Sequence, residues 1–163
     1  MSALYNLLKT DQGLYSFTTD TGISYTAFFI ACPIKDKEAN EHIAYSFGFD
    51  REGKFELAKF SHAYDVKVKN TIVYIIKEFF DKNGDKALLY LCYPEDEYAR
   101  HRSIIFSKWH KEELLDQITH IKKNTTFNDE ILYGGILVTK ENPLLDLLLD
   151  AIDGYINDIT DQK

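Results

Sequence analysis

Residues 65–110 read DVKVKNTIVYIIKEFFDKNGDKALLYLCYPEDEYARHRSIIFSKWH, and this stretch decides the fold class. Its first third predicts a helix that ends near Lys82, because apolar residues recur there at helical spacing: Ile72, Ile75, Ile76, Phe79 and Phe80. The run Ala87–Tyr93 is apolar throughout, which is typical of an inner strand covered on both faces. A second helix should follow from Pro94 to about His110, opened by acidic residues that the helix dipole favours. The stretch therefore predicts helix, buried strand, helix.

The N-terminal part favours strands. Residues 14–19 and 23–32 alternate aromatic and polar side chains around a turn at Asp20-Thr21-Gly22, so we expect a hairpin. Pro33 should end its second strand, because proline has no N–H for the ladder. Residues 43–49 alternate strictly between large apolar and small residues, which predicts another strand with one buried face.

The C-terminal part predicts two strands and a helix. Residues 118–127 are read as a polar edge strand, and residues 131–139 as a more apolar strand. The pair Gly134-Gly135 inside the latter indicates a bulge or a close approach of another group to the backbone. Asn142-Pro143 is a helix start, with Asn as the cap and Pro in the first turn. The helix should carry a long apolar stripe through Leu145, Leu148 and Ile152.

These elements predict one α+β domain over residues 1–163, built on a mostly antiparallel twisted sheet with helices packed on it. The core spans residues 14–139, and an extra C-terminal helix spans residues 142–159. The two strands that flank the first central helix could be parallel, joined by a right-handed crossover. A short helix over residues 2–8 and a weak strand over residues 55–60 are further expectations.

Composition limits the function classes. The formal charge of −7 disfavours a nucleic-acid binder, since phosphates are repelled by an acidic surface. The chain has no apolar run of the length that a membrane span needs and no signal-peptide pattern, so we expect a cytoplasmic protein. Cys32 and Cys92 lie in apolar runs and are expected to be inert core thiols. No His or Cys spacing indicates a metal site, so none is predicted.

The order strand, strand, strand, helix, strand, helix, strand, strand resembles the core of the GNAT superfamily of N-acetyltransferases. The segment Asp96-Glu97-Tyr98-Ala99 is similar to the Asn-x-x-Ala that opens the second helix in many members. The resemblance implies that Ala87–Tyr93 splays from its neighbouring strand. It also implies a pyrophosphate of acetyl-CoA or another acyl-CoA at the start of the first helix, which we expect at Asn70 or Thr71.

The residues that this resemblance assigns to the coenzyme are Lys69, Asn70 and Thr71 for the pyrophosphate and Tyr90 for the pantetheine arm. The sequence departs from the family pattern in the phosphate loop, because residues 65–71 contain no glycine. The tyrosine that often protonates the leaving thiolate is also replaced, by Ser103. These departures indicate a GNAT-like order of elements whose coenzyme site is lost or atypical.

A narrower resemblance is to a small uncharacterised bacterial family, a domain of unknown function. It rests on the two helices, the strand between them and the start of the last helix: Thr71-Ile72, Ile75-Ile76, Phe79-Phe80, Leu89–Cys92, Asp96, Arg100, Arg102, Phe106, Trp109 and Asn142-Pro143. This resemblance implies no activity.

Two further features could bind a partner. Arg100 and Arg102 could bind an anion. An ion pair between Asp96 and Arg100, four residues apart on the helix, is the simpler explanation for Arg100. The C-terminal helix has more leucines than one narrow stripe needs, so it either packs across the sheet or forms part of a homodimer or another protein interface.

Two functional hypotheses follow. The first is a non-catalytic binding or interaction module that acts through protein contact, as a homodimer or with another partner, and holds no cofactor. The alternative is an acyl-CoA-dependent N-acyltransferase with an atypical pyrophosphate loop. Whether the chain is an enzyme is left open by the sequence.

Overall fold

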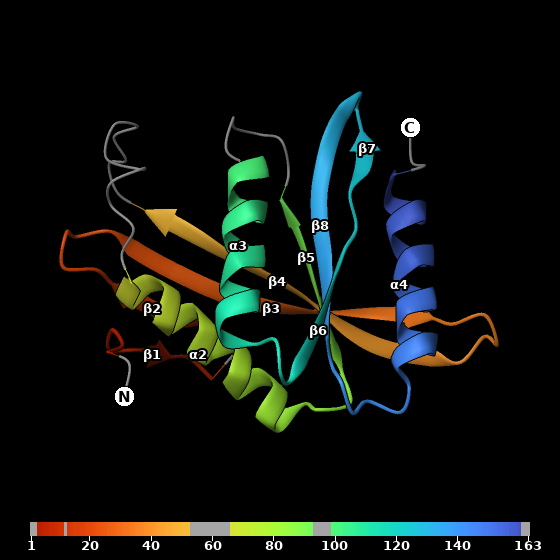
Figure 1. The fold of residues 1–163 in the computed structure, drawn as a ribbon, viewed down its shortest axis with the longest axis horizontal. Helices are drawn as coiled ribbons and strands as arrows, with labels where there is room; N and C mark the ends of the chain where they lie inside the picture. Colours follow the sequence, from red (N-terminus) through yellow and green to blue (C-terminus); the bar gives the residue numbers. More distant parts are fainter. Residues whose placement is uncertain (1–2, 12, 53–65, 93–98, 161–163) are drawn as a thin grey trace.

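The computed structural model describes residues 3–11, 13–52, 66–92 and 99–160. They form an α+β fold with an eight-stranded, mixed but mostly antiparallel sheet and three helices (Figure 1). The strand order is β1-β2-β3-β4-β5-β8-β6, and β7 pairs with β8 outside this path. The elements in chain order are β1 (Leu8–Lys9), β2 (Tyr15–Thr18), β3 (Ser24–Lys35), β4 (Glu41–Glu52), α2 (Val66–Lys82), β5 (Ala87–Cys92), α3 (Ala99–Glu113), β6 (Ile118–Lys122), β7 (Thr125–Phe127), β8 (Glu130–Thr139) and α4 (Leu145–Thr160).

The β4–β5 pair is the parallel pair of the sheet, as the sequence predicts for the strands flanking the first central helix. It is short. Pairing covers only Ala44–Ser46 against Ala87–Leu89, after which β4 continues to Glu52 and β5 to Cys92 without pairing to each other. Figure 1 shows the two strands diverging above this point, with α3 in front of the opening.

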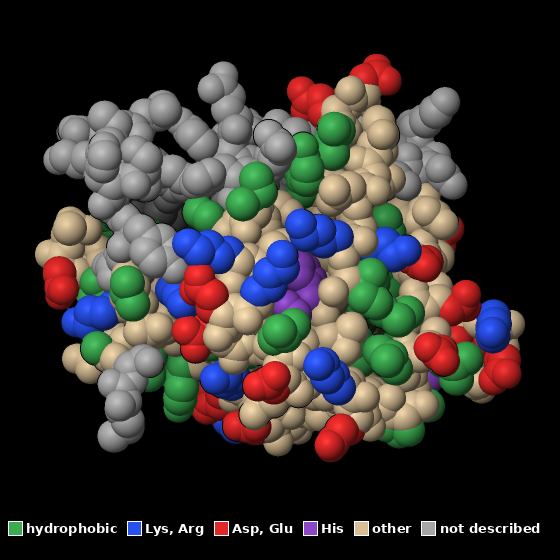
Figure 2. Space-filling view, in the orientation of Figure 1, with side chains coloured by type: hydrophobic (Ala, Val, Ile, Leu, Met, Phe, Trp, Pro, Cys, Tyr) green, Lys and Arg blue, Asp and Glu red, His purple; other side chains and the backbone are tan. Residues whose placement is uncertain are grey.

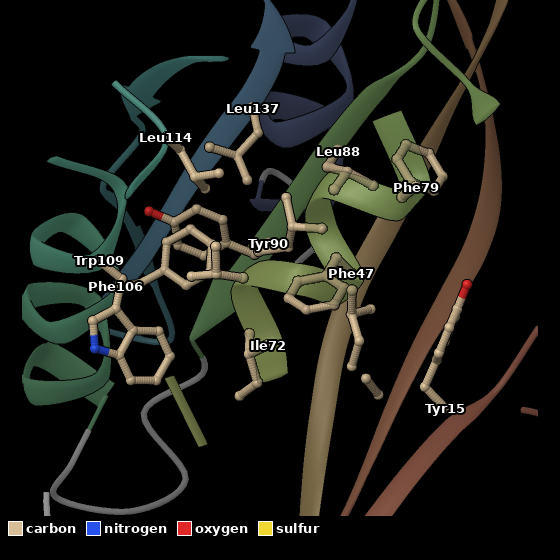
Figure 3. Close-up of a cluster of buried hydrophobic side chains, with 14 of the residues drawn as sticks. Tyr15, Phe47, Ile72, Phe79, Leu88, Tyr90, Phe106, Trp109, Leu114 and Leu137 are labelled. Atoms are coloured by element: carbon tan, nitrogen blue, oxygen red, sulfur yellow. The ribbon is translucent and has the colours of Figure 1, made fainter. Parts of the chain in front are cut away.

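The sheet has an apolar core on each face. The first core lies under α2 and α3 and takes Leu88 and Tyr90 from β5. The second core lies under α4 and takes Ala87 and Leu89 from the same strand. Because successive side chains of a strand point to opposite faces, β5 is covered on both sides, as its unbroken apolar sequence predicts. Figure 3 shows the first core, with rings from sheet and helices in contact.

The end of β3 differs from the prediction. The strand does not stop at Pro33 but runs on to Lys35, and Pro33 lies opposite Ile43. Among the described residues, β3 beyond Ala27 pairs only with β4, because β2 ends its pairing there. Pro33 therefore lies in an edge-like stretch, where a missing N–H on the open side costs little.

Two helix predictions in the first half of the chain are wrong: the short helix over residues 2–8, and the start of the first central helix at Asn70 or Thr71. Residues 3–7 form no helix, and Leu8–Lys9 pair with β2. A seven-residue helix is only marginally stable by itself, and here the Tyr5 N–H donates to the Thr71 hydroxyl on α2 instead. Helix α2 begins at Val66 rather than at Asn70 or Thr71. The weak strand expected over residues 55–60 lies outside the described residues.

The predicted C-terminal elements are present, although α4 begins at Leu145, three residues after the predicted start at Asn142-Pro143. Asn142 caps the turn before α4, because its side-chain oxygen accepts a hydrogen bond from the Leu144 N–H at 2.8 Å. The predicted edge strand over residues 118–127 is present as β6 and β7, interrupted at Lys123, whose N–H donates to the Gly134 carbonyl at 2.9 Å. The helix packs across the sheet through the predicted stripe, which includes Leu148 and Ile152.

Candidate functional site

The four residues that the resemblance assigns to a coenzyme are separated by the structure. Lys69, Asn70 and Thr71 lie in the first two turns of α2, and Tyr90 lies on β5 below α3. Because α2 begins at Val66, the backbone N–H groups of Asn70 and Thr71 lie inside the helix and not at its open end, where a free anion would be held.

Thr71 and Asn70 both hold the N-terminal segment. The Thr71 side chain is fully buried; its hydroxyl donates to the Lys67 carbonyl at 2.6 Å and accepts from the Tyr5 N–H at 3.0 Å. The Asn70 side-chain amide donates to the Ala3 carbonyl at 3.2 Å. These contacts explain why polar residues stand here on a helix that is otherwise apolar on its inner face.

Lys69 ties α2 to α3. Its ammonium group bonds to the Glu112 carboxylate and lies 3.0 Å from that of Glu113. The Lys69 side chain is only 10% exposed, so the pair of carboxylates supplies the charge that a buried ammonium needs. The hydrogen bond from Lys69 lowers the pKa of Glu112 below its ordinary value.

Tyr90 projects from β5 toward α3 and is 5% exposed. Its ring packs against Phe106 of α3, with the ring centroids 4.4 Å apart, as Figure 3 shows. Its hydroxyl reaches past the central strand β8 and lies 2.5 Å from Nε2 of His120 on the edge strand β6. The Tyr90 side chain can cross β8 because its register partner on that strand is Gly135: a Cβ at position 135 would lie 2.4 Å from the Tyr90 hydroxyl oxygen.

Two histidines meet beside this tyrosine. The rings of His110, on α3, and His120 have centroids 5.1 Å apart. His110 is 6% exposed and its Nε2 donates to the Ile118 carbonyl at 2.6 Å. Burial, helped by the electrostatic effect of nearby His110 and Lys122, lowers the pKa of His120 to about 4. His120 is therefore neutral at pH 7, and with Tyr90 it forms a neutral hydrogen-bonded pair.

The surface over these rings is basic. Figure 2 shows histidine at the surface between α3 and the β6–β8 strands, with basic side chains around it. Lys122 projects from β6 on the same side as His120, two residues away. Arg100 and Arg102, the predicted anion-binding residues, lie in the first turn of α3, but their side chains lie outside the described part of the chain.

The comparisons with known proteins give a family. The sequence model of the "Family of unknown function (DUF6169)" matches residues 64–154. The chain belongs to this family. The match spans α2 through most of α4, so it contains Tyr90, both histidines and the residues on which the narrower resemblance rests. No curated protein and no solved structure matched, so the comparisons give no support to the GNAT resemblance.

The described part of this DUF6169 protein gives two results, one on metal binding and one on membrane crossing. It contains no group of three or more His, Cys, Asp or Glu side chains placed to hold a metal ion. None of its helices combines the length and apolar character that crossing a membrane requires.

The outer part of the α4 face is incompletely covered. Phe28, Ile30, Cys32 and Ile34 share one side of β3, and Ile34 is buried in the second core. Helix α4 covers this side of β3 from Ile34 to Cys32, whose sulfur lies 3.8 Å from the Tyr155 hydroxyl of α4. Ile30 is 56% exposed, and the half-buried Phe28 ring fills the space that a Cβ at Gly48 would occupy. An apolar strip thus continues from α4 onto β3.

The sequence analysis singled out Tyr90 but missed its partner. His120 lies thirty residues away, and no spacing rule connects the two. A usable signal was present in Gly134-Gly135, which predicts a close approach to the β8 backbone. The prediction is confirmed: Leu91 crowds position 134 and Tyr90 crowds position 135.

Proposed function

We propose that this DUF6169 protein is a non-catalytic binding module that acts through protein contact, as a homodimer, on a GNAT-like core over residues 14–139. The observation that carries the proposal is the apolar strip of Phe28, Ile30 and Cys32 beside α4, which is open in the described part of one chain. An apolar strand face next to a packed helix is stabilised when a second surface covers it. A second copy brings the same strip about a two-fold axis.

Three of the predicted coenzyme residues support a binding module over a catalyst. The Lys69 ammonium pairs with two carboxylates, the Thr71 hydroxyl has two backbone partners, and the Tyr90 hydroxyl is bonded to His120. A ligand that used these groups would have to break contacts between elements of the fold. The C-terminal helix enters this proposal through its edge at Tyr155, since its main apolar stripe is buried on the sheet.

Light scattering on the eluate of a sizing column, at several loading concentrations, tests the homodimer. We expect a mass that rises toward twice that of one chain, and a shift to monomer in Ile30→Asp. Ile131→Asp is the matched control, because Ile131 is 53% exposed and lies on β8 outside the strip. A monomeric wild-type protein at every concentration, or equal effects of the two substitutions, refutes the proposal.

The alternative is the acyl-CoA-dependent N-acyltransferase. One observation favours it: β4 and β5, which α2 connects, pair in parallel over only three positions. The GNAT resemblance implies a strand that splays from its neighbour, and this short pairing is compatible with that. Thermal unfolding with and without acetyl-CoA decides between the two. A ligand at a hundred times its Kd stabilises the native state by about 2.7 kcal/mol. For the binding module we expect no rise in Tm; a clear rise would favour the transferase.

A further inference from the structure

The polar cluster at the β5–β8–β6 side of the first core combines groups from three elements. Tyr90 comes from β5, His110 from α3, and His120 with Lys122 from β6. Tyr90 and Lys122 are both register partners of Gly135 on β8, so they flank the one position on this row that has no side chain. The absence of a Cβ there brings groups from both sides of β8 together.

Each imidazole of the cluster is anchored through one nitrogen. His110 uses Nε2 to donate to the Ile118 carbonyl, and His120 uses Nε2 to bond to the Tyr90 hydroxyl. Among the described residues, neither Nδ1 has a hydrogen-bond partner. Rings fixed by one nitrogen present the other in a set direction, so little side-chain entropy is lost when a ligand bonds to it.

The charge around the cluster selects the sign of a ligand. The whole chain is acidic, at −7, yet the groups that act electrostatically on His120 from α3 and β6 are His110 and Lys122, both basic. The group from β5 is the neutral Tyr90 hydroxyl. Figure 2 shows further basic side chains around the histidine surface. A local basic patch on an acidic protein attracts anions and repels metal cations.

We propose that His120 and Lys122 form a binding site for a small oxyanion, a phosphate or carboxylate group of a ligand, with Tyr90 and His110 as positioning residues. The Nδ1–H of His120 and the ammonium group of Lys122 donate to the anion. Tyr90 fixes the His120 ring from behind, and His110 packs beside that ring, with the two ring centroids 5.1 Å apart. The site is independent of the strip on β3, and its failure would leave the homodimer proposal untouched.

Binding of an anion has a signature at His120. The neighbouring basic groups and burial disfavour a charged His120 ring, and a bound oxyanion offsets them, so saturation should raise the pKa of His120 by about one. Histidine ring signals in NMR spectra of the isotope-labelled full chain report this directly. Inorganic phosphate and acetate are the two probes, each compared with chloride at equal ionic strength.

We expect a saturable shift of the His120 ring signals with phosphate or acetate, weakened about tenfold in Lys122→Gln, because a charge-assisted hydrogen bond is lost. Lys122 is exposed at a sheet edge, so the variant should remain folded. Lys37→Gln, at an exposed position in the β3–β4 turn, is the matched control and should bind as wild type. A response to acetate alone supports the site and assigns it to carboxylates. A shift that does not saturate, or that is equal in both variants, overturns the proposal.

Discussion

Replacing Gly135 by alanine should damage both the fold and the polar cluster. The new Cβ would lie 2.4 Å from the hydroxyl oxygen of Tyr90, 2.5 Å from its Cζ and 2.6 Å from its Cε1. Real carbon atoms do not approach so closely, so the Tyr90 ring has to move. Phe106 packs on this ring at 4.4 Å and the side chain is 5% exposed, so free space for that movement is scarce.

The size of the effect follows from three contributions. Overpacking of a filled core costs about 1–3 kcal/mol. Loss of the hydrogen bond between Tyr90 and His120 costs about 1 kcal/mol more. Removal of a glycine from a strand returns about 0.5–1 kcal/mol of backbone entropy. We therefore expect Gly135→Ala to lower the free energy of unfolding by about 2 kcal/mol, a fall in Tm of about 4–8 °C at this chain length.

Gly48→Ala is the matched control, because its Cβ would lie 2.6 Å from the Phe28 ring. That ring is half-buried on the open part of the sheet and can turn toward solvent, so the cost should stay below about 1 kcal/mol. Urea unfolding followed by the fluorescence of Trp109, the single tryptophan, measures both. The reasoning is refuted if the two variants lose equal stability, or if Tyr90→Leu does not reduce the cost of alanine at position 135.

Three further predictions concern contacts elsewhere. Thr71→Val keeps the side-chain shape but removes the buried hydroxyl that accepts from the Tyr5 N–H, so calorimetry should show a loss of about 2 kcal/mol. An unchanged Tm would contradict the role of this hydroxyl. Asn142→Ser keeps a capping oxygen and removes a buried side-chain amide nitrogen that has no partner among the described residues, so its Tm should equal or exceed that of wild type. Asn142→Ala loses the capping oxygen and should lower the free energy of unfolding by about 1 kcal/mol. Equal Tm values for the two variants in thermal unfolding would argue against the cap. The Asp36 carboxylate bonds to His42 at 2.6 Å, and this contact lowers the pKa of Asp36 below its usual 3.8. The ionised carboxylate therefore stabilises the fold above pH 3.8, and this stabilisation is lost as the pH falls through the lowered pKa. The difference in stability between wild type and Asp36→Asn should shrink in acid, and a difference independent of pH would contradict this role.

The parts of the fold that the sequence predicts correctly are those with one dominant signal. The apolar run of β5 predicts an inner strand, and the strict alternation over residues 43–49 predicts a strand; both strands are present. The expectation of one buried face is wrong for β4, because Phe47 is buried in the first core and Ala44 in the second. The Asn142-Pro143 pair predicts the last helix to within three residues of its start, since α4 begins at Leu145. Each of these signals is local.

The errors arise where a distant contact outweighs a local preference. Asn70 and Thr71 have the chemistry of helix caps, yet both lie inside α2, because their side chains are used to hold residues 3–5. Pro33 is a strand breaker by propensity, but its neighbouring strand ends before it and removes the cost. The Tyr90–His120 pair also depends on contacts that no local pattern encodes.

The polar cluster depends on the register of three strands, and that register is fixed from the opposite face of the sheet. Tyr90 meets Gly135 only while β5 and β8 keep their pairing; a slip of one residue would place Gly134 or Ile136 opposite Tyr90. The same slip would turn Ile136 and Val138 out of the second core, where both are buried under α4. Helix α4 thus helps to set the position of groups on the opposite face of the sheet. Loss of packing under α4 should therefore loosen the bond between Tyr90 and His120 as well as lower stability.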